Sequence, residues 1–326
     1  MGPLRARISF RREDGFWKGN GNHNEPYETA KERLTGRILQ TPDFYLLQTL
    51  YDAWVMDTAS VGRYHYRWRV DGSQPNRDPM HMARYCLSNL WRAGLLLRGR
   101  PQAAQTGGSV PFFYRISRLG YEVLKREHWD PRAVSEIDRG YAESKASLDR
   151  ILHHAEVSDF ITRWLVELEQ HVDPQWLFWT PVGVAACEIG SGAQAVRLSP
   201  DGIVQVGPPK SCAVYFVEWE RSADSEHFRD KLRRMNDFRL AIGWQRARHA
   251  YGVSLFGPPR YLVVAWEEAD PMLGRVRTGR GTLAALLGVA RDHEEGDYAL
   301  FLRGEDWEQG RWKATSIRGD EWDLLA

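Results

Sequence analysis

Apolar residues in the first third of the chain recur at the spacing of an amphipathic helix in three successive segments. The first segment begins at Thr41-Pro42, a pair typical of a helix start, and its apolar face consists of Phe44, Leu47, Leu50, Tyr51 and Trp54. Two further helices are predicted over residues 58–66 and 79–93. Gly94 directly follows the last of them, in the position where glycine commonly ends a helix.

Two short strands are predicted after these helices, over residues 95–97 and 112–116, and a polar loop with glycine and proline separates them. A further helix begins at Ser117. Three helices followed by a two-stranded wing are typical of the winged helix, a variant of the helix-turn-helix. We therefore predict a winged-helix domain over residues 34–126, preceded by a disordered arm over residues 1–33.

The second half of the chain has a different order of elements. Residues 127–147 are charged and weakly periodic, which predicts a connector, and a strong helical pattern follows from Leu148. Strands are predicted over residues 176–179, 182–189, 195–198, 213–220, 260–266 and 298–302, and helices over residues 225–244 and 283–290. Because a helix, several strands, a helix and a strand form an α/β order, residues 148–326 are predicted to be a second domain.

The composition is that of a globular protein, with 43% hydrophobic and 27% charged residues. No stretch approaches the roughly 20 apolar residues that a membrane helix needs, and the polar N-terminus lacks the apolar segment of a secretory signal. Cys86, Cys187 and Cys212 are widely spaced, which argues against a disulfide framework and against a structural zinc site. We therefore expect a cytoplasmic protein without a membrane partner.

Positive charge is concentrated in the predicted winged helix. Residues 77–126 contain nine Lys or Arg residues and two acidic residues, a local balance of +7 in a chain whose net charge is +1. Such residues neutralise phosphates and supply most of the nonspecific affinity of a protein for DNA. The alternative is a solvated face on a winged helix that contacts proteins.

If the domain binds double-stranded DNA, its third helix enters the major groove, where Arg and Asn pair with base edges. The candidate contacts on or just before that helix are Arg77, His81, Arg84, Tyr85, Ser88, Asn89 and Arg92. The candidate contacts on or near the wing are Arg98, Arg100 and Arg115. Leu87, Leu90 and Trp91 are predicted to belong to the core of the helix.

Acidic residues gather around one predicted strand of the second domain. Asp201 lies in a turn before it, and Glu218 and Glu220 near its end share one face, with Cα atoms roughly 7 Å apart. Carboxylates at the end of an apolar strand suit a bound Mg²⁺ or Mn²⁺, and Lys231 in the following helix can approach the same corner. The alternative is a solvated strand end whose acids pair with nearby arginines.

These motifs carry a resemblance to a known family. The segments Leu198-Ser199-Pro200-Asp201-Gly202, Phe216-Val217-Glu218-Trp219-Glu220-Arg221-Ser222 and Lys231-Leu232 resemble those of the plasmid replication-relaxation family. The resemblance covers residues 35–266 and implies a winged helix joined to an acidic block. That block is also similar to the PD-(D/E)xK nuclease superfamily, which implies a restriction-endonuclease-like core of helix, three strands, helix and strand (αβββαβ).

The resemblance implies roles for the acidic residues. Asp201 and Glu218 would bind the metal, and Glu220 would occupy the position that usually holds Lys. Without a Lys at that position, either Lys231 replaces it, as occurs in that superfamily, or the site is inactive. Glu156 would be the additional acid that some members carry.

Two functions therefore remain open. The first is a DNA endonuclease or nickase of a plasmid or mobile element, dependent on Mg²⁺ or Mn²⁺, with Asp201, Glu218, Glu220 and Lys231 as its catalytic residues. The second is a noncatalytic DNA-binding regulator of replication, transfer or transcription, in which the nuclease-like fold serves as a platform for binding or for a homodimer. The sequence lacks a P-loop and an H-E-x-x-H motif, which excludes the common NTPase and zinc-protease classes.

Overall fold

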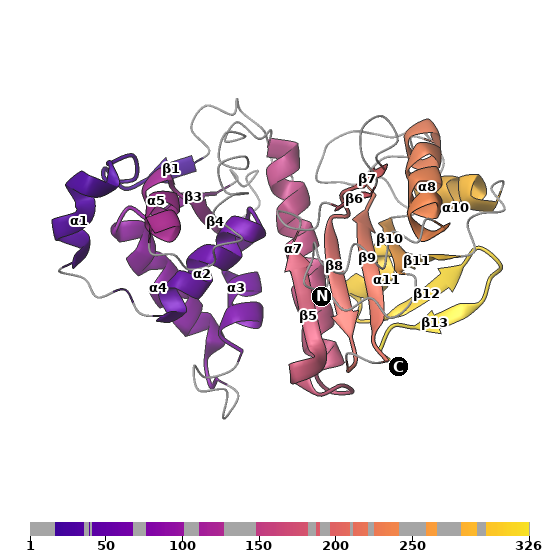
Figure 1. Cartoon of the computed structure of the whole chain (residues 1–326). Helices are drawn as coiled ribbons and strands as arrows, with labels where there is room; N and C mark the ends of the chain where they lie inside the picture. Colours follow the sequence, from indigo (N-terminus) through magenta and orange to yellow (C-terminus); the bar gives the residue numbers. More distant parts are fainter. Residues whose placement is uncertain are drawn as a thin grey trace, which may run out of the picture. The chain divides into compact units, whose positions relative to one another are not determined.

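The structure is a computed structural model that describes residues 17–35, 39, 41–67, 76–100, 111–126, 148–181, 187–189, 196–208, 211–220, 225–240, 259–265, 282–291 and 298–325. Its internal contacts divide the chain into two units, residues 1–163 (unit 1) and residues 164–326 (unit 2). Both units contain helices and strands (Figure 1), so the expected mixture of α and β structure is confirmed. The expected connector over residues 127–147 lies outside the described residues.

Unit 1 combines short helices with a small antiparallel sheet. Its elements are β1 (Trp17–Gly19), α1 (Tyr27–Thr35), α2 (Thr41–Asp52), β2 (Met56–Asp57), α3 (Thr58–His65), α4 (Pro79–Arg92), β3 (Leu96–Gly99), β4 (Phe113–Ile116), α5 (Arg118–Arg126) and the first part of α7 (Leu148–Leu168). The strands lie in the order β1-β3-β4-β2, and every neighbouring pair is antiparallel.

Local signals position the helices of unit 1. The carboxylate of Asp57 accepts a hydrogen bond from the backbone N–H of Ser60 and caps α3. The carboxylate of Asp78 likewise caps α4, which begins at Pro79. Gly94, with φ of 83°, adopts the left-handed conformation that follows the end of α4.

The N-terminal segment differs from the expected disordered arm where it is described. Strand β1 pairs with β3 in the register Lys18 to Arg98, and the carbonyl of His23 accepts a hydrogen bond from Leu119 of α5. Strand β1 has only three residues and helix α1 is polar, so neither has enough apolar periodicity to be predicted from the sequence. Residues 1–16 lie outside the described part of the chain.

The long helix α7 contributes to both units. Ile151, Leu152 and Ala155 form one apolar cluster with Val55 and Phe113 of unit 1. The division between the units therefore falls after residue 163, inside the helix, and not before residue 148 as the sequence suggested. The sequence pattern marks where a helix starts but not which partner each turn of it packs against.

Unit 2 is built on a seven-stranded mixed sheet. Its elements after α7 are a 3₁₀ turn (Pro174–Trp176), β5 (Leu177–Pro181), β6 (Cys187–Ile189), β7 (Val196–Leu198), β8 (Gly202–Val206), β9 (Ala213–Trp219), α8 (Ser225–Leu240), β10 (Arg260–Ala265), α10 (Thr282–Arg291), β11 (Ala299–Arg303), α11 (Gly304–Glu308), β12 (Lys313–Ser316) and β13 (Glu321–Asp323). The sheet order is β13-β12-β11-β10-β9-β8-β5, while β6 and β7 pair separately. Strands β9, β10 and β11 are parallel, and the other pairs are antiparallel.

The core of unit 2 lies between the sheet and helices α8 and α10, which are side by side in Figure 1. Phe216 of β9 and Val263 of β10 pack there against Phe228 and Leu232 of α8. Residues of β9 alternate between faces, so Glu218 shares the α8 face with Phe216, while Trp219 packs on Trp307 at the opposite face. No helix in the described ranges combines the length and the apolar character that a membrane crossing requires.

Candidate functional site

Helix α4 presents a polar face to solvent. Ala83, Leu87 and Leu90 are fully buried on its inner side. Five of the predicted DNA contacts on or beside α4 are exposed, namely Arg77, His81, Arg84, Tyr85 and Arg92, while Ser88 and Asn89 are half-buried. Tyr85 keeps 60% of its surface exposed and adds an aromatic ring to this face. The helix therefore offers hydrogen-bond donors and arginine cations on one accessible face.

The predicted contacts on β3 and β4 do not all lie together. The guanidinium of Arg98 lies 3.5 Å from the ring centre of Trp91 and 5.0 Å from that of Phe112, and Arg100 lies 5.1 Å from the Phe112 ring. Arg115 instead lies 5.7 Å from the ring of Trp17. Arg98 is paired across the sheet with Tyr114, the neighbour of Arg115, so Arg98 and Arg115 point to opposite faces.

Trp91 differs from its predicted place in the core of α4. Its ring is only half-buried and carries the guanidinium of Arg98, and its Nε1 donates a hydrogen bond to the carbonyl of Lys18 at 3.0 Å. Sequence spacing alone cannot distinguish an apolar residue that packs in a core from one that supports a cation. We call Trp91, Arg98 and Phe112 the Arg98 stack.

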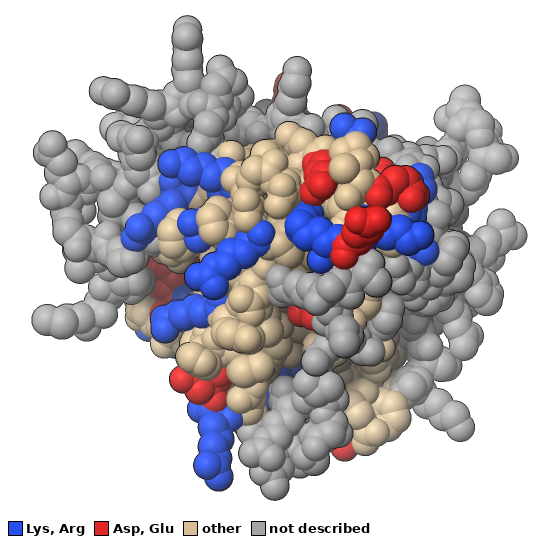
Figure 2. All heavy atoms as spheres, turned by 90° about the vertical axis from the view of Figure 1, so that its left-hand side faces the viewer, with Lys and Arg blue, Asp and Glu red and all other residues tan. Residues whose placement is uncertain are grey.

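Basic side chains outnumber acidic ones on this side of unit 1. In the view of Figure 2, which shows the side where α1 lies in Figure 1, Lys and Arg side chains cover more of the described surface than Asp and Glu side chains do. Within the described residues, Arg77, Arg84, Arg92 and Arg98 form no ion pair with a carboxylate. Positive charge that no carboxylate of the described residues neutralises is available to an external anion.

The acidic residues of unit 2 meet at the end of β9. The side chains of Glu218 and Glu220 are buried although both are acids. Lys231 of α8 lies between them, with its Nζ 2.7 Å from Oε2 of Glu218 and 2.5 Å from Oε1 of Glu220. The structure therefore brings these three predicted site residues together.

Asp201 completes the group at the start of β8. Its backbone N–H donates to the carbonyl of Val217 at 2.9 Å, and its Oδ2 accepts from the N–H of Trp219 at 2.8 Å. We call Asp201, Glu218, Glu220 and Lys231 the ionic cluster. Glu156 lies in the part of α7 that belongs to unit 1, and the charges that act on Glu218 come from the other members of the cluster.

Burial dominates the electrostatics of the ionic cluster. Burial raises the pKa of Glu218; the charge of Lys231 opposes this shift, and those of Asp201 and Glu220 add to it. Burial lowers the pKa of Lys231, but the three carboxylates together outweigh burial and hold that pKa above its ordinary value. Lys231 is therefore protonated at neutral pH and acts as an internal counter-ion.

The described residues of the ionic cluster are not arranged around a binding position for a divalent cation. Mg²⁺ prefers several oxygen ligands around one position, and Lys231 already occupies the space between two of the carboxylates. Among the described residues there is no group of three His, Cys, Asp or Glu side chains that could hold a metal ion. The residues present supply suitable oxygen atoms, but they do not surround a position where a metal fits.

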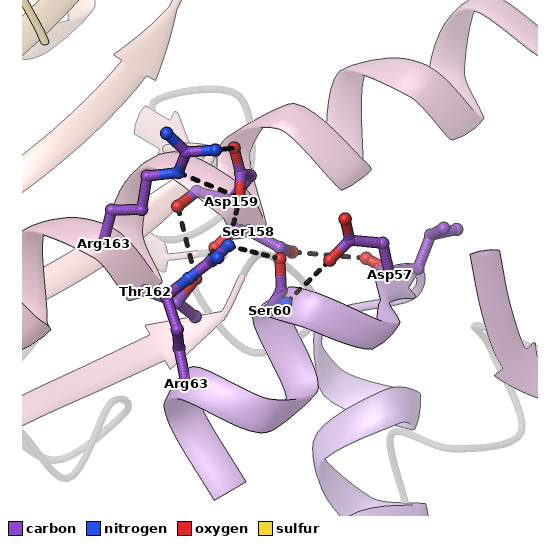
Figure 3. Close-up of polar contacts among 8 residues, drawn as sticks. Asp57, Ser60, Arg63, Ser158, Asp159, Thr162 and Arg163 are labelled. Atoms are coloured by element: carbon purple, nitrogen blue, oxygen red, sulfur yellow. Dashed lines mark hydrogen bonds and ion pairs between the residues drawn. The ribbon is translucent and has the colours of Figure 1, made fainter. Parts of the chain in front are cut away.

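A second polar network, which sequence reasoning missed, joins α3 to α7 within unit 1. Figure 3 shows Arg63 of α3 and Arg163 of α7 pointing toward the carboxylate of Asp159, with which both form ion pairs. Arg63 also donates to Thr162 at 3.2 Å, and Ser158 donates to the carbonyl of Val55 at 3.2 Å. An Arg and an Asp separated by so many residues give no signal in a single sequence.

No protein-family model matches the chain, and no curated protein or solved structure gives a significant match to it.

Proposed function

We propose that unit 1 binds double-stranded DNA, with α4 as the helix that enters the major groove. The observation that carries the proposal is the order α2, β2, α3, α4, β3, β4 together with the pairing of β2 on β4. This is the arrangement expected of a winged helix, in which the third helix is presented by the core and two strands form the wing. The exposed side of α4 then faces the DNA.

The chemistry of α4 supports this proposal. Arg84 and Arg92 are exposed cations without ion-pair partners among the described residues, which suits contact with phosphates or guanine edges. Asn89 has the side chain that pairs with adenine.

Fluorescence anisotropy with labelled DNA duplexes tests this function. The wild type should bind a random duplex in a salt-dependent manner and should enrich a preferred sequence from a random pool. Arg84→Gln should weaken binding to the preferred sequence by roughly tenfold or more, as expected for loss of one base contact. The matched control is Arg233→Gln on α8, whose exposed side chain pairs with Asp230. A wild type that does not bind duplex DNA contradicts the proposal.

The second candidate function is metal-dependent cleavage of the bound DNA at the ionic cluster. The observation that favours it is the meeting of two buried carboxylates and one lysine at the end of β9, an interior strand of the sheet. Mg²⁺ or Mn²⁺ would supply activation of water in such an enzyme. Because the described residues do not surround a metal position, we derive no catalytic step through one.

A cleavage assay separates the enzyme from a noncatalytic regulator of a plasmid or mobile element. Supercoiled and linear DNA are incubated with the wild type, Asp201→Asn and Glu218→Gln in Mg²⁺ or Mn²⁺. Cleavage by the wild type that both variants lose supports the nuclease. Intact DNA with every metal, while the wild type still binds the DNA, supports the regulator.

A further inference from the structure

We infer that strand β1 provides, with β3, a second phosphate-binding site formed by Lys18 and Arg98, apart from the exposed face of α4. The inference rests on the proposed binding of DNA by unit 1 and adds a contact that reads no base. Its ligand is the phosphodiester backbone of a DNA duplex. Four structural observations support it.

The first observation is a pair of like charges in register. Lys18 of β1 lies directly opposite Arg98 of β3 in an antiparallel pair, so the two side chains leave the same face of the sheet. Like charges at directly opposite positions destabilise a sheet. A bound anion that touches both cations removes this repulsion, and a phosphate group has several oxygen atoms with which to do so.

The second observation is the absence of an internal counter-ion. Within the described part of the chain, neither Lys18 nor Arg98 forms an ion pair with a carboxylate. By contrast, Arg33 pairs with Glu25 and Arg126 pairs with Glu28 in the same unit. These two acidic residues of unit 1 therefore neutralise other arginines.

The third observation is the fixed orientation of Arg98. The Arg98 stack places its guanidinium 3.5 Å from the ring centre of Trp91 and 5.0 Å from that of Phe112. The N–H groups of a guanidinium held over an aromatic ring remain in the guanidinium plane, where they can donate in pairs to phosphate oxygens. Stacking also removes much of the side-chain freedom that binding would otherwise restrict.

The fourth observation is that Trp91 connects this site to α4. The same indole that supports Arg98 donates from Nε1 to the carbonyl of Lys18 at 3.0 Å, and Asn20 donates to the carbonyl of Arg92. These contacts attach β1 and Asn20, the residue after it, to the last turn of α4. Lys18 and Arg98 are therefore held beside the end of the helix that contacts the DNA, and Trp91 acts as a positioning residue.

The dependence of DNA binding on salt concentration tests the inference. Each phosphate contact contributes about 0.9 to the slope of log K against log salt concentration. Lys18→Gln and Arg98→Gln should each lower the magnitude of that slope by about 1, and the double variant by about 2. The losses should be equal for two duplexes of unrelated sequence, because the contact reads no base. Lys313→Gln, an exposed lysine of β12 that pairs with Glu321, is the control and should retain the wild-type slope.

Further variants separate a binding role from a structural one. Circular dichroism reports whether Arg98→Gln perturbs folding. Because Lys18 is exposed, Lys18→Gln tests the site even if Arg98→Gln does not fold. Trp91→Phe retains an aromatic ring beneath Arg98 but loses the donor to Lys18, and it should weaken binding less than Trp91→Leu does. A double variant, Lys18→Gln with Arg98→Gln, that folds and keeps the wild-type slope overturns the inference while DNA binding by α4 stands. A wild type that does not bind DNA instead overturns the proposed function.

Discussion

The Nζ atom of Lys231 lies 2.7 Å from Oε2 of Glu218 and joins helix α8 to strand β9 through an ion pair whose carboxylate is buried. Only 3% of the Glu218 side chain is exposed, against 22% for Lys231. Removing one partner of a buried pair leaves the other without compensation, which costs more free energy than the intact pair contributes. The pair is therefore a sensitive point in the stability of unit 2.

Lys231→Met is expected to lower the free energy of unfolding by about 3 kcal/mol, because two buried carboxylates lose their counter-ion. Urea denaturation measures the change. The control is Arg233→Met, which removes an exposed ion pair with Asp230 and should cost no more than about 1 kcal/mol. In the double variant Lys231→Met with Glu218→Gln, the free energy of unfolding should fall by less than the sum of the decreases in the two single variants. Equal effects of Lys231→Met and its control would contradict this account.

Asp57→Asn is expected to leave unit 1 at least as stable as the wild type at neutral pH. Burial raises the pKa of Asp57, and the charge of Asp159 adds to the shift, so the folded state disfavours the ionised carboxylate. The free energy of unfolding therefore falls as pH rises from the unfolded pKa of Asp57 through its folded pKa. Asn keeps the oxygen that caps α3 at Ser60 without this penalty.

Asp57→Ala is the matched variant, because it removes the charge and the cap together. It should lower the free energy of unfolding by about 1 kcal/mol relative to Asp57→Asn. Thermal unfolding over a range of pH compares the three proteins, and the advantage of Asn over the wild type should grow with pH. An advantage that shrinks as pH rises would show that the carboxylate is favoured in the folded state.

The imidazole of His65 should have a pKa far below that of an ordinary histidine. Burial lowers its pKa to about 4, and its Nε2 faces the carbonyl of Pro42 at 3.3 Å. Because the unfolded chain takes up the proton more readily, the stability of unit 1 should be lost as pH falls from about 6.5 through about 4, by up to about 3 kcal/mol. NMR titration of the imidazole measures the pKa directly. In His65→Gln this part of the acid sensitivity should disappear, and a measured pKa near 6.5 would contradict the expectation.

Much of the fold follows from signals within a few residues of one another. Helices α3 and α4 lie close to their predicted bounds because Asp57 and Asp78 cap their first turns and Gly94 follows the second. The meeting of Glu218 with Glu220 and Lys231 was also predictable, because strand alternation and the order of elements bring them to one corner. In each case the deciding interaction is local or follows from the regular geometry of a strand.

The features that the sequence did not predict depend on contacts between distant residues. Strand β8 lacks the alternation of a half-buried strand, because Gln205 is buried together with its apolar neighbours, and no strand was predicted between residues 198 and 213. The role of Trp91 depends on Arg98 and on Lys18, and β1 is defined only by its pairing with β3. Apolar spacing identifies a buried or supporting face but not the chain segment that meets it.

Asp159→Asn is expected to loosen the contact between α3 and α7 and to lower the pKa of Asp57. Asp159 is the carboxylate that both Arg63 and Arg163 contact, so its neutralisation removes the ion-pair partner that the two arginines share. The ion pairs of Asp159 with Arg63 and Arg163 are partly exposed, so the free energy of unfolding should fall by about 1–2 kcal/mol, between the values for exposed and buried pairs. Because the charge of Asp159 raises the pKa of Asp57, that pKa should decrease in the variant while burial keeps it above the ordinary value.

Carboxyl carbon NMR measures the pKa of Asp57, and Asp306→Asn, which removes the partner of Arg311 in unit 2, is the control. An unchanged pKa of Asp57 in Asp159→Asn would show that the two carboxylates do not interact, and the network of Figure 3 would then reduce to the two arginine contacts.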